Sequence, residues 1–429
     1  MKNRSVDLAR LLLEHGADSN ARDKDRLTPF YLAVTDGRVD LARLLIEHGA
    51  DVTVPDRDGA TPLHLAVRKG SVDLIRLLVE YSVDATVWDH DRATPLHLAP
   101  QEGSVDLVRF LVEHGVDATY PDRNEATPLH LAVQNGSMDL VRLLLEHGVG
   151  ATVRDGDRVT PLHLAVQKGS VGLVRLLLEH GVDATVRDDH RATPLHLAVQ
   201  KGAVDLIRLL LEHGTDTTVW DHNGATPLHL AVQEGSVDPV RLLLGHRVDT
   251  TVRDGNKATP LHLAVQKGSV DLVRLLLEHD VDATIRDDNR ATPLHLAVQN
   301  GSVDLVQLLL EFGVDTTIRD DNRATPLHLA VQKGNVDLVR LLLEFGADAT
   351  IRDDDRATPL HLAVKNGSVD LVRLLLHRGA DATIREDDRA TPLHLAVQNG
   401  SVDLVQLLLE FGVDTTIRDD KRATPLHLC

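Results

Sequence analysis

Histidines and carboxylates are the side chains with which this sequence would perform acid–base catalysis or bind a metal. The chain has 24 histidines among its 429 residues, and 65 aspartates and glutamates. Histidine is the commonest metal ligand and titrates near neutral pH. However, twelve of these histidines follow the tripeptide Thr-Pro-Leu at regular intervals, as His64, His163 and His262 do. A catalytic or metal site is normally unique in a chain, so this recurrence favours a structural role.

The interval is 33 residues, without insertion or deletion. The tetrapeptide Thr-Pro-Leu-His begins at Thr61, Thr94, Thr127, Thr160, Thr193, Thr226, Thr259, Thr292, Thr325, Thr358, Thr391 and Thr424. A diverged copy, Thr28-Pro29-Phe30-Tyr31, precedes them. The sequence therefore predicts a half repeat over residues 1–27, twelve complete repeats over 28–423 and a truncated repeat over 424–429, all in one continuous solenoid.

Each period predicts two short helices, as residues 259–291 illustrate. Thr259 is a good N-cap, and Pro260 at the first helical position needs no N–H donor. Gly268 ends this first helix, and Ser269 caps a second one. The second helix is apolar almost all round apart from a narrow polar stripe, so neighbouring repeats must cover it. The extended and polar segment that follows predicts a β-hairpin-like finger between repeats.

At this point the sequence resembles the ankyrin repeat family, which has a period of 33 and a T-P-L-H-x-A signature. The resemblance covers essentially the whole chain. It implies an all-α repeat solenoid of L-shaped helix–turn–helix units with projecting fingers. It also implies a concave surface of fingers and first helices that binds another protein.

Some positions depart from the family pattern. The family usually has Gly in the finger turn two residues before the Thr, but only Gly59 and Gly224 keep it here. Arg, Lys or Glu stands there elsewhere, so the turn conformation is left open. Pro100 replaces the usual Val inside a first helix, where its ring should clash with the preceding turn. Pro239 lies in the first turn of a second helix and should do little harm.

The histidines form two series, both of which we interpret as structural. Those of the Thr-Pro-Leu-His motif should hydrogen-bond back across the helix cap. Neighbouring copies lie about 10 Å apart by helix packing, whereas zinc needs nitrogens at about 2.0–2.1 Å. The second series, which includes His48 and His147, should interact with the C-terminal end of the second helix. We therefore expect no catalytic residue, no metal site and no cofactor.

Charge and hydropathy argue against nucleic acid and against insertion into a membrane. The net charge is −19, so the basic footprint of a nucleic-acid-binding protein is missing. No apolar run approaches the roughly 18–20 residues of a membrane span, and the first residues do not resemble a signal peptide.

Cys429 is the sole cysteine, which fits a reducing compartment. We expect an intracellular, cytoplasmic protein.

Candidate partner-binding residues come from positions that differ between repeats. We call one such position the finger slot: Arg286, Arg319 and Arg352 fill it in later repeats, whereas Pro55, Trp88, Pro121 and Trp220 fill it in earlier ones. Trp88 and Trp220 replace a charged residue, so the slot should face solvent. Either these rings contact a partner, as exposed Trp often does, or each ring folds over the adjacent finger.

The favoured function is a protein-interaction module or scaffold for an unidentified protein partner, without enzymatic activity. One alternative is the recognition array of a larger multidomain enzyme or signalling protein, because the chain starts and stops within a repeat. Another alternative is an elastic spacer without a defined ligand. The terminal repeats lack polar caps, which such arrays normally need, so self-association through the uncapped ends is also expected. Leu8, Leu11, Leu12 and Leu13 should be exposed there.

Overall fold

The computed structural model of the chain describes residues 2–99 and 104–429. Pro100, for which the sequence predicts a disrupted helix, lies outside the described residues. The structure divides into two compact units, Met1–Asp216 and Thr217–Cys429, which we call unit 1 and unit 2. Each unit is a stack of the same helical repeat, and we describe each by itself.

Unit 1 is built of helices in its described residues. The first helices, which begin at the proline of each Thr-Pro step, are α2 (Pro29–Thr35), α4 (Pro62–Arg68), α6 (Pro95–Leu98), α8 (Pro128–Asn135), α10 (Pro161–Gln167) and α12 (Pro194–Gln200). The second helices are α1 (Lys2–Glu14), α3 (Val39–Glu47), α5 (Val72–Glu80), α7 (Val105–Glu113), α9 (Met138–Glu146), α11 (Val171–Glu179) and α13 (Val204–Glu212).

Unit 2 continues the same alternation. Its first helices are α14 (Pro227–Glu234), α16 (Pro260–Lys267), α18 (Pro293–Asn300), α20 (Pro326–Gln332), α22 (Pro359–Lys365) and α24 (Pro392–Gln398), followed by the 3-10 helix η1 (Pro425–Leu428). Its second helices are α15 (Val237–Gly245), α17 (Val270–Leu277), α19 (Val303–Glu311), α21 (Val336–Glu344), α23 (Val369–His377) and α25 (Val402–Glu410).

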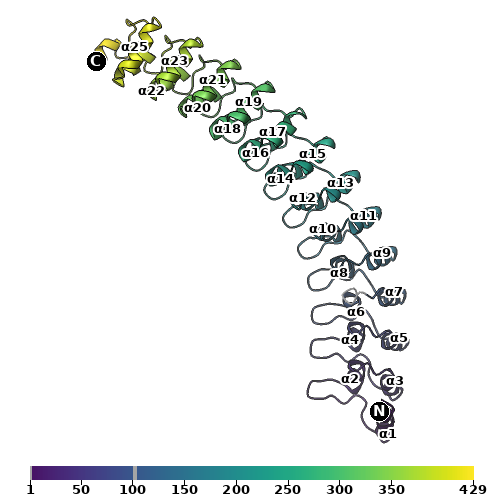
Figure 1. Cartoon of the computed structure of the whole chain (residues 1–429). Helices are drawn as coiled ribbons and strands as arrows, with labels where there is room; N and C mark the ends of the chain where they lie inside the picture. The colour runs from purple at the N-terminus through teal and green to yellow at the C-terminus, as the bar shows by residue number, and fades with distance from the viewer. Residues whose placement is uncertain (1, 100–103) are drawn as a thin grey trace. The chain divides into compact units, whose positions relative to one another are not determined.

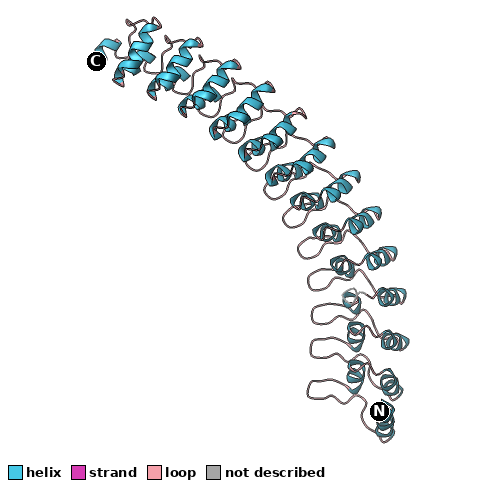
Figure 2. Ribbon diagram, viewed as in Figure 1, coloured by secondary structure: helices cyan, strands magenta, loops and turns pink. Residues whose placement is uncertain are grey.

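Within each unit the helices form two rows. The even-numbered first helices form one row and the odd-numbered second helices the other, and the fingers project beside the first-helix row (Figure 1). A first helix typically packs against the second helix of its own repeat and against the next first helix, as α16 does with α17 and α18. The described residues contain no strand, and the fingers are loops (Figure 2). The predicted all-α repeat solenoid is thus confirmed.

The helix boundaries follow from the capping residues that the sequence predicts. Thr259 is extended, with φ −89° and ψ 166°, and Pro260 takes the first helical position of α16. Gly268 ends α16 in the left-handed conformation at φ 78°, which costs a residue without a Cβ little. Ser269 then caps α17, and its hydroxyl accepts from the N–H of Leu272 at 3.4 Å.

The core lies between the two helix rows. In α17, Leu272, Val273 and Leu276 are fully buried, whereas the polar residues Asp271 and Arg274 are exposed. This confirms the prediction that neighbouring repeats cover the second helix on every side except its polar stripe. Truncating such a buried leucine to alanine lowers the free energy of unfolding by about 2–5 kcal/mol. Core positions therefore tolerate few substitutions, and residues that differ between repeats for functional reasons are expected in the fingers.

Exposed leucines mark the first described helix. Leu8, Leu11 and Leu12 of α1 are exposed, at 62%, 53% and 61%. Leu13 is half-buried, so the prediction of an exposed face is correct for three of its four residues.

Candidate protein-binding surface

A single aspartate closes the finger in nearly every repeat. In the finger after α17, the Oδ1 atom of Asp287 accepts from the backbone N–H groups of Asn289 and Ala291, both at 2.9 Å. The backbone N–H of Asp287 also donates to the carbonyl of Ala291, at 2.9 Å. A short acidic side chain is suited to this turn because it reaches its own backbone two residues on. The finger is therefore held by side-chain hydrogen bonds where the sequence predicted a β-hairpin-like segment.

The finger turn adopts the left-handed conformation whether or not it contains glycine. Gly59 and Gly224 have φ of 80° and 75°, and Arg290, at the corresponding position, has φ 55°. The turn that the sequence left open is therefore retained when arginine replaces glycine. A side chain in this region costs about 1–2 kcal/mol, so the arginine fingers carry local strain.

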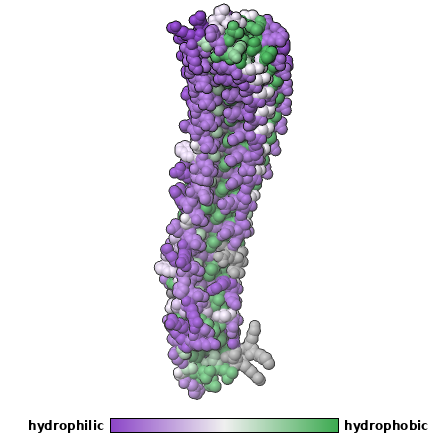
Figure 3. All heavy atoms as spheres, turned by 90° about the vertical axis from the view of Figure 1, so that its left-hand side faces the viewer, coloured by the Kyte–Doolittle hydropathy of each residue, from purple (hydrophilic) through white to green (hydrophobic). Residues whose placement is uncertain are grey.

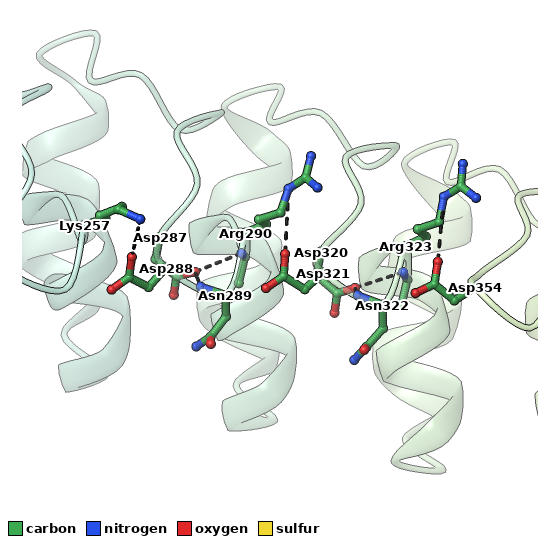
Figure 4. A network of polar contacts seen from close by, with 12 residues as sticks. Lys257, Asp287, Asp288, Asn289, Arg290, Asp320, Asp321, Asn322, Arg323 and Asp354 are labelled. Atoms are coloured by element: carbon green, nitrogen blue, oxygen red, sulfur yellow. Dashed lines mark hydrogen bonds and ion pairs between the residues drawn. The ribbon is translucent and has the colours of Figure 1, made fainter.

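Backbone hydrogen bonds and ion pairs join neighbouring fingers. The N–H of Asp321 donates to the carbonyl of Asn289 at 3.2 Å, and Arg290 Nε lies 3.8 Å from Asp321 Oδ1. Figure 4 shows the same arrangement one repeat on, where Arg323 Nε lies 3.8 Å from Asp354. These side chains are exposed, so each ion pair contributes at most about 1 kcal/mol. Their main effect is to fix the spacing between fingers.

The first histidine series caps its helices and also bridges repeats. His295 Nδ1 accepts from the backbone N–H of Thr292 at 3.2 Å, so Nε2 carries the proton and donates to the carbonyl of Ala324 at 3.2 Å. The predicted bond across the cap is confirmed. The second bond, which reaches 29 residues along the chain to the following finger, was not predicted, because sequence spacing alone does not show which carbonyl faces Nε2.

Burial keeps these histidines neutral. Desolvation lowers the pKa of His295, and it lowers the pKa of His328 and His361 to about 4. A neutral ring with one donor and one acceptor nitrogen is what both hydrogen bonds require. The rings of His295 and His328 use both nitrogens within the fold, which leaves neither for a metal or a substrate.

One finger of unit 2 breaks the pattern. Glu386 stands where the other fingers have aspartate, and Asp388 takes over the bond to the N–H of Ala390, at 2.9 Å. Glu386 is buried and its carboxylate lies 2.7 Å from Lys365 Nζ. Burial raises the pKa of Glu386. The buried Nε2 of His361 in α22 has no hydrogen-bond partner, so the bridge that His295 makes is absent at this finger.

Trp88 lies exposed in the finger slot of unit 1. Its side chain is 53% exposed, and its ring stacks on Tyr120 of the next finger, with 5.5 Å between centroids and 7° between planes. The Arg92 guanidinium lies 5.8 Å from the Tyr120 ring centroid on the same finger surface. The ring thus covers the adjacent finger, as one of the two interpretations expects, and still presents about half of its surface to solvent.

Models of tandem ankyrin repeats match almost the entire sequence. The description "Ankyrin repeats (3 copies)" matches residues 54–122, 96–188, 162–254, 240–320 and 294–386. "Ankyrin repeats (many copies)" matches residues 12–62 and 384–429. The chain belongs to the ankyrin repeat family. Ankyrin repeats are generally protein–protein interaction modules, and ankyrin repeat proteins are typically not enzymes.

Solved structures that resemble this ankyrin chain include the ankyrin repeat domain of Bcl-3, which is described as a unique member of the IkappaB protein family. The sequences are 32% identical over a match that covers 51% of this chain and 98% of that domain, with a TM-score of 0.48. No curated protein matches the chain.

Trp220 occupies the ankyrin finger slot of the other unit. It is 48% exposed, which agrees with a solvent-facing slot. Trp88 belongs to unit 1 and Trp220 to unit 2. Sequence reasoning singled out both tryptophans but missed Tyr120 and Arg92, which complete the surface around Trp88. Tyr120 carries a detectable signal, because valine or isoleucine fills its position in every other finger except the first, which has Ala21.

The second histidine series lies at the ends of the second ankyrin helices. His147 Nδ1 lies 2.9 Å from the carbonyl of Leu143, and His180 Nδ1 lies 2.8 Å from that of Leu176. These contacts confirm the predicted capping of helix ends. Phe312 takes the same place in a later repeat and is 43% exposed.

Neither a metal centre nor a membrane span emerges from the described ankyrin repeats. In residues 2–99 and 104–429, His, Cys, Asp and Glu side chains nowhere form a group of three or more that could hold a metal ion. Over the same residues, every helix is too short or too polar to cross a bilayer.

Proposed function

We propose that this protein binds a partner protein through the surface formed by its fingers and first helices, with Trp88 and Trp220 as contact residues. The observation that carries the proposal is the exposed Trp88–Tyr120 pair. Large rigid aromatic rings give much contact area for little lost entropy, and they are enriched among binding hot spots.

The rigidity of the fingers supports this role. The N–H of His90 donates to the carbonyl of Asp58 at 2.9 Å, and the N–H of Arg123 donates to that of Asp91 at 2.8 Å. These bonds hold the finger of Trp88 between its two neighbours. Stacking on Tyr120 fixes the ring further. A preorganised contact residue loses little freedom when a partner binds.

The experiment captures partners from a cell extract with the whole chain and then measures their affinity for two variants. Trp88→Arg installs the residue common in the finger slot and should weaken the captured partner at least tenfold, because a hot-spot residue contributes about 2 kcal/mol or more. Trp220→Arg should weaken it as well. Helical circular dichroism should be unchanged in both variants.

Tyr81→His is the matched control. Tyr81 is 46% exposed and lies at the end of a second helix in the same repeat as Trp88, where most repeats have histidine. The Tyr81→His substitution removes an exposed aromatic ring that lies outside the fingers, so partner affinity should stay the same. Unchanged affinity in both tryptophan variants, or a loss in Tyr81→His alone, would remove the finger surface from the interface.

We also propose that copies of the 429-residue chain associate through exposed leucines. Leu8, Leu11 and Leu12 form an exposed apolar face on α1, and apolar surface of this kind favours association. Leu8→Lys with Leu12→Lys should shift sedimentation toward the monomer at high concentration. A wild-type chain that already sediments as a monomer at the highest soluble concentration would refute this.

A further inference from the structure

Four arginines line a hollow between two neighbouring fingers of unit 2. Its volume is about 530 Å³. Arg286, Arg290, Arg319 and Arg323 line it together with Asp315 and Asp320. Hydrophilic residues predominate on the side of the molecule that Figure 3 shows. The hollow is therefore suited to a charged ligand.

The two carboxylates of the hollow are already engaged within their own finger. Asp315 Oδ1 accepts from the N–H and the hydroxyl of Thr317, at 2.8 and 2.7 Å. Asp320 Oδ1 accepts from the N–H groups of Asn322 and Ala324, both at 2.9 Å. Each carboxylate thus uses its Oδ1 atom within the finger, and the two carboxylates neutralise the four lining guanidinium groups only in part.

The guanidinium groups retain free donors. Arg290 and Arg323 contact their aspartates through Nε alone, and their terminal nitrogens point away from those carboxylates (Figure 4). Arg286 and Arg319, in the finger slot, form no ion pair in the part of the chain that the structure describes. Guanidinium groups hydrogen-bond carboxylates with two parallel donors, so the hollow presents the chemistry of an anion site.

The finger-slot arginines also recur along unit 2. They are Arg253, Arg286, Arg319, Arg352, Arg385 and Arg418. The first helices beside them pack directly on one another, which sets a repeat spacing of about 8–10 Å. Three residues of an extended polyproline II chain advance about 9 Å. One acidic side chain in every three residues would therefore keep in register with the arginines.

We propose that the finger-slot arginines of unit 2 bind an extended acidic segment of a partner protein, with a carboxylate at every third residue. This inference rests on the proposed protein-binding function and names the chemistry of the partner. The protein's net charge of −19 repels a dense polyanion at long range. A segment with sparse, correctly spaced carboxylates meets the arginines with less of that repulsion.

The test uses a labelled peptide of four Glu-Pro-Pro units and fluorescence anisotropy with the full chain. Prolines hold the peptide extended, and the four glutamates match Arg253, Arg286, Arg319 and Arg352. A second peptide has the same composition but four adjacent glutamates, and a third has glutamine in place of glutamate. Inorganic polyphosphate is the non-peptide probe. The spaced peptide should bind at least fivefold more tightly than the others, and its affinity should fall as salt rises.

Two double variants with the same charge change locate the site. Arg286→Gln with Arg319→Gln should weaken the spaced peptide about tenfold or more, because two charged contacts are lost. Arg274→Gln with Arg340→Gln is the control, since both residues are exposed on second helices, and it should change affinity less than twofold. Circular dichroism of both variants should match that of the wild type.

Equal binding of the spaced and clustered peptides or of polyphosphate would overturn the spacing argument. Binding that is lost equally in both double variants would overturn the assignment to the finger slots, and so would a failure of the spaced peptide to bind. Capture of a partner that depends on Trp88 would leave the proposed function intact in each of these cases. Conversely, the spaced peptide could bind while captured partners have unchanged affinity for both tryptophan variants. That result would contradict only the proposed contacts of Trp88 and Trp220.

Discussion

The fingers around Trp88 in unit 1 and those around Arg319 in unit 2 share the hydrogen bonds that shape the turn. They differ in the chemistry of the side chains that they expose. In both, an aspartate holds the turn, and backbone hydrogen bonds join neighbours. The slot carries a stacked aromatic ring in unit 1 and arginines beside a polar hollow in unit 2. Side chains in the slot can therefore change chemistry without altering the scaffold, because the bonds that shape the finger come from other residues.

The interiors of the two units differ far less than their fingers. Thr-His caps and buried leucines recur in both, and cap histidines such as His130 and His295 bond to the following finger. A substitution there leaves a cavity or an unpaired polar group, whereas a substitution in the slot changes only what solvent or a partner meets. Differences in binding should therefore map to the fingers, and differences in stability to the caps and turns.

The largest expected effect is acid destabilisation, which should be greater in unit 2. Burial lowers the pKa of His328 and His361 from 6.5 to about 4. Above pH 6.5 these histidines are neutral in both the folded and the unfolded chain, and the free energy of unfolding is at its full value. As pH falls from 6.5 toward 4, the unfolded chain binds protons and the folded chain does not, so the free energy of unfolding decreases. Each of these two should cost roughly 2 kcal/mol at pH 5. Urea unfolding at pH 7.5 and 5.0 measures this.

Tryptophan fluorescence separates the two units in that experiment. The chain has two tryptophans, so Trp88→Arg leaves a reporter in unit 2 and Trp220→Arg leaves one in unit 1. His328→Gln should remove part of the pH dependence in unit 2, while His279→Gln, at an exposed helix end, should not. Equal pH dependence in wild type and His328→Gln would show that the buried histidines are not responsible.

The next effect concerns the irregular finger of unit 2. Glu386→Asp should restore the turn found in the other fingers and return a partner to His361 Nε2. Leaving a buried polar group unpaired costs about 1–3 kcal/mol, so the variant should gain about 1 kcal/mol, seen as a higher urea midpoint. Asp353→Glu, in the preceding finger, should lose a similar amount. A destabilised Glu386→Asp would mean that the Lys365 pair outweighs the disturbed bridge.

The smallest effect concerns the left-handed turns. Arg290→Gly should relieve backbone strain of about 1–2 kcal/mol and lose an exposed ion pair worth up to about 1 kcal/mol. A net gain of about 0.5 kcal/mol is expected, with weaker acidic-peptide binding. Gly224→Arg should instead be destabilising, because a Cβ there would lie 2.7 Å from the backbone nitrogen of Gly255. Gains in both variants would contradict the strain argument.

Much of the fold was accessible from the sequence because its determinants are local. Thr259, Pro260 and Gly268 define a helix by their own conformational preferences, and apolar periodicity identifies the faces that neighbours cover. The bridge from His295 to Ala324 and the displaced bond of Ala390 depend instead on how one repeat lies against the next. Sequence patterns do not contain that geometry.

The candidate site was less accessible for a related reason. Trp88 was recognised because it departs from the residues of its slot, and its exposure follows from that position. The stack with Tyr120 and the hollow beside Arg286 arise between fingers that are a full repeat apart. Residue types at positions 88 and 120 each stand out in the sequence, but they do not show that the two rings meet.

Each histidine bridge joins residues that lie 29 positions apart, such as His64 and Ala93. Contacts this close in sequence close small loops, which favours fast folding. During synthesis from the N-terminus, a first helix can complete its hydrogen bonds once the finger that follows it has left the ribosome. Assembly can then advance one repeat at a time behind the growing end of the chain, without waiting for distant segments to be made.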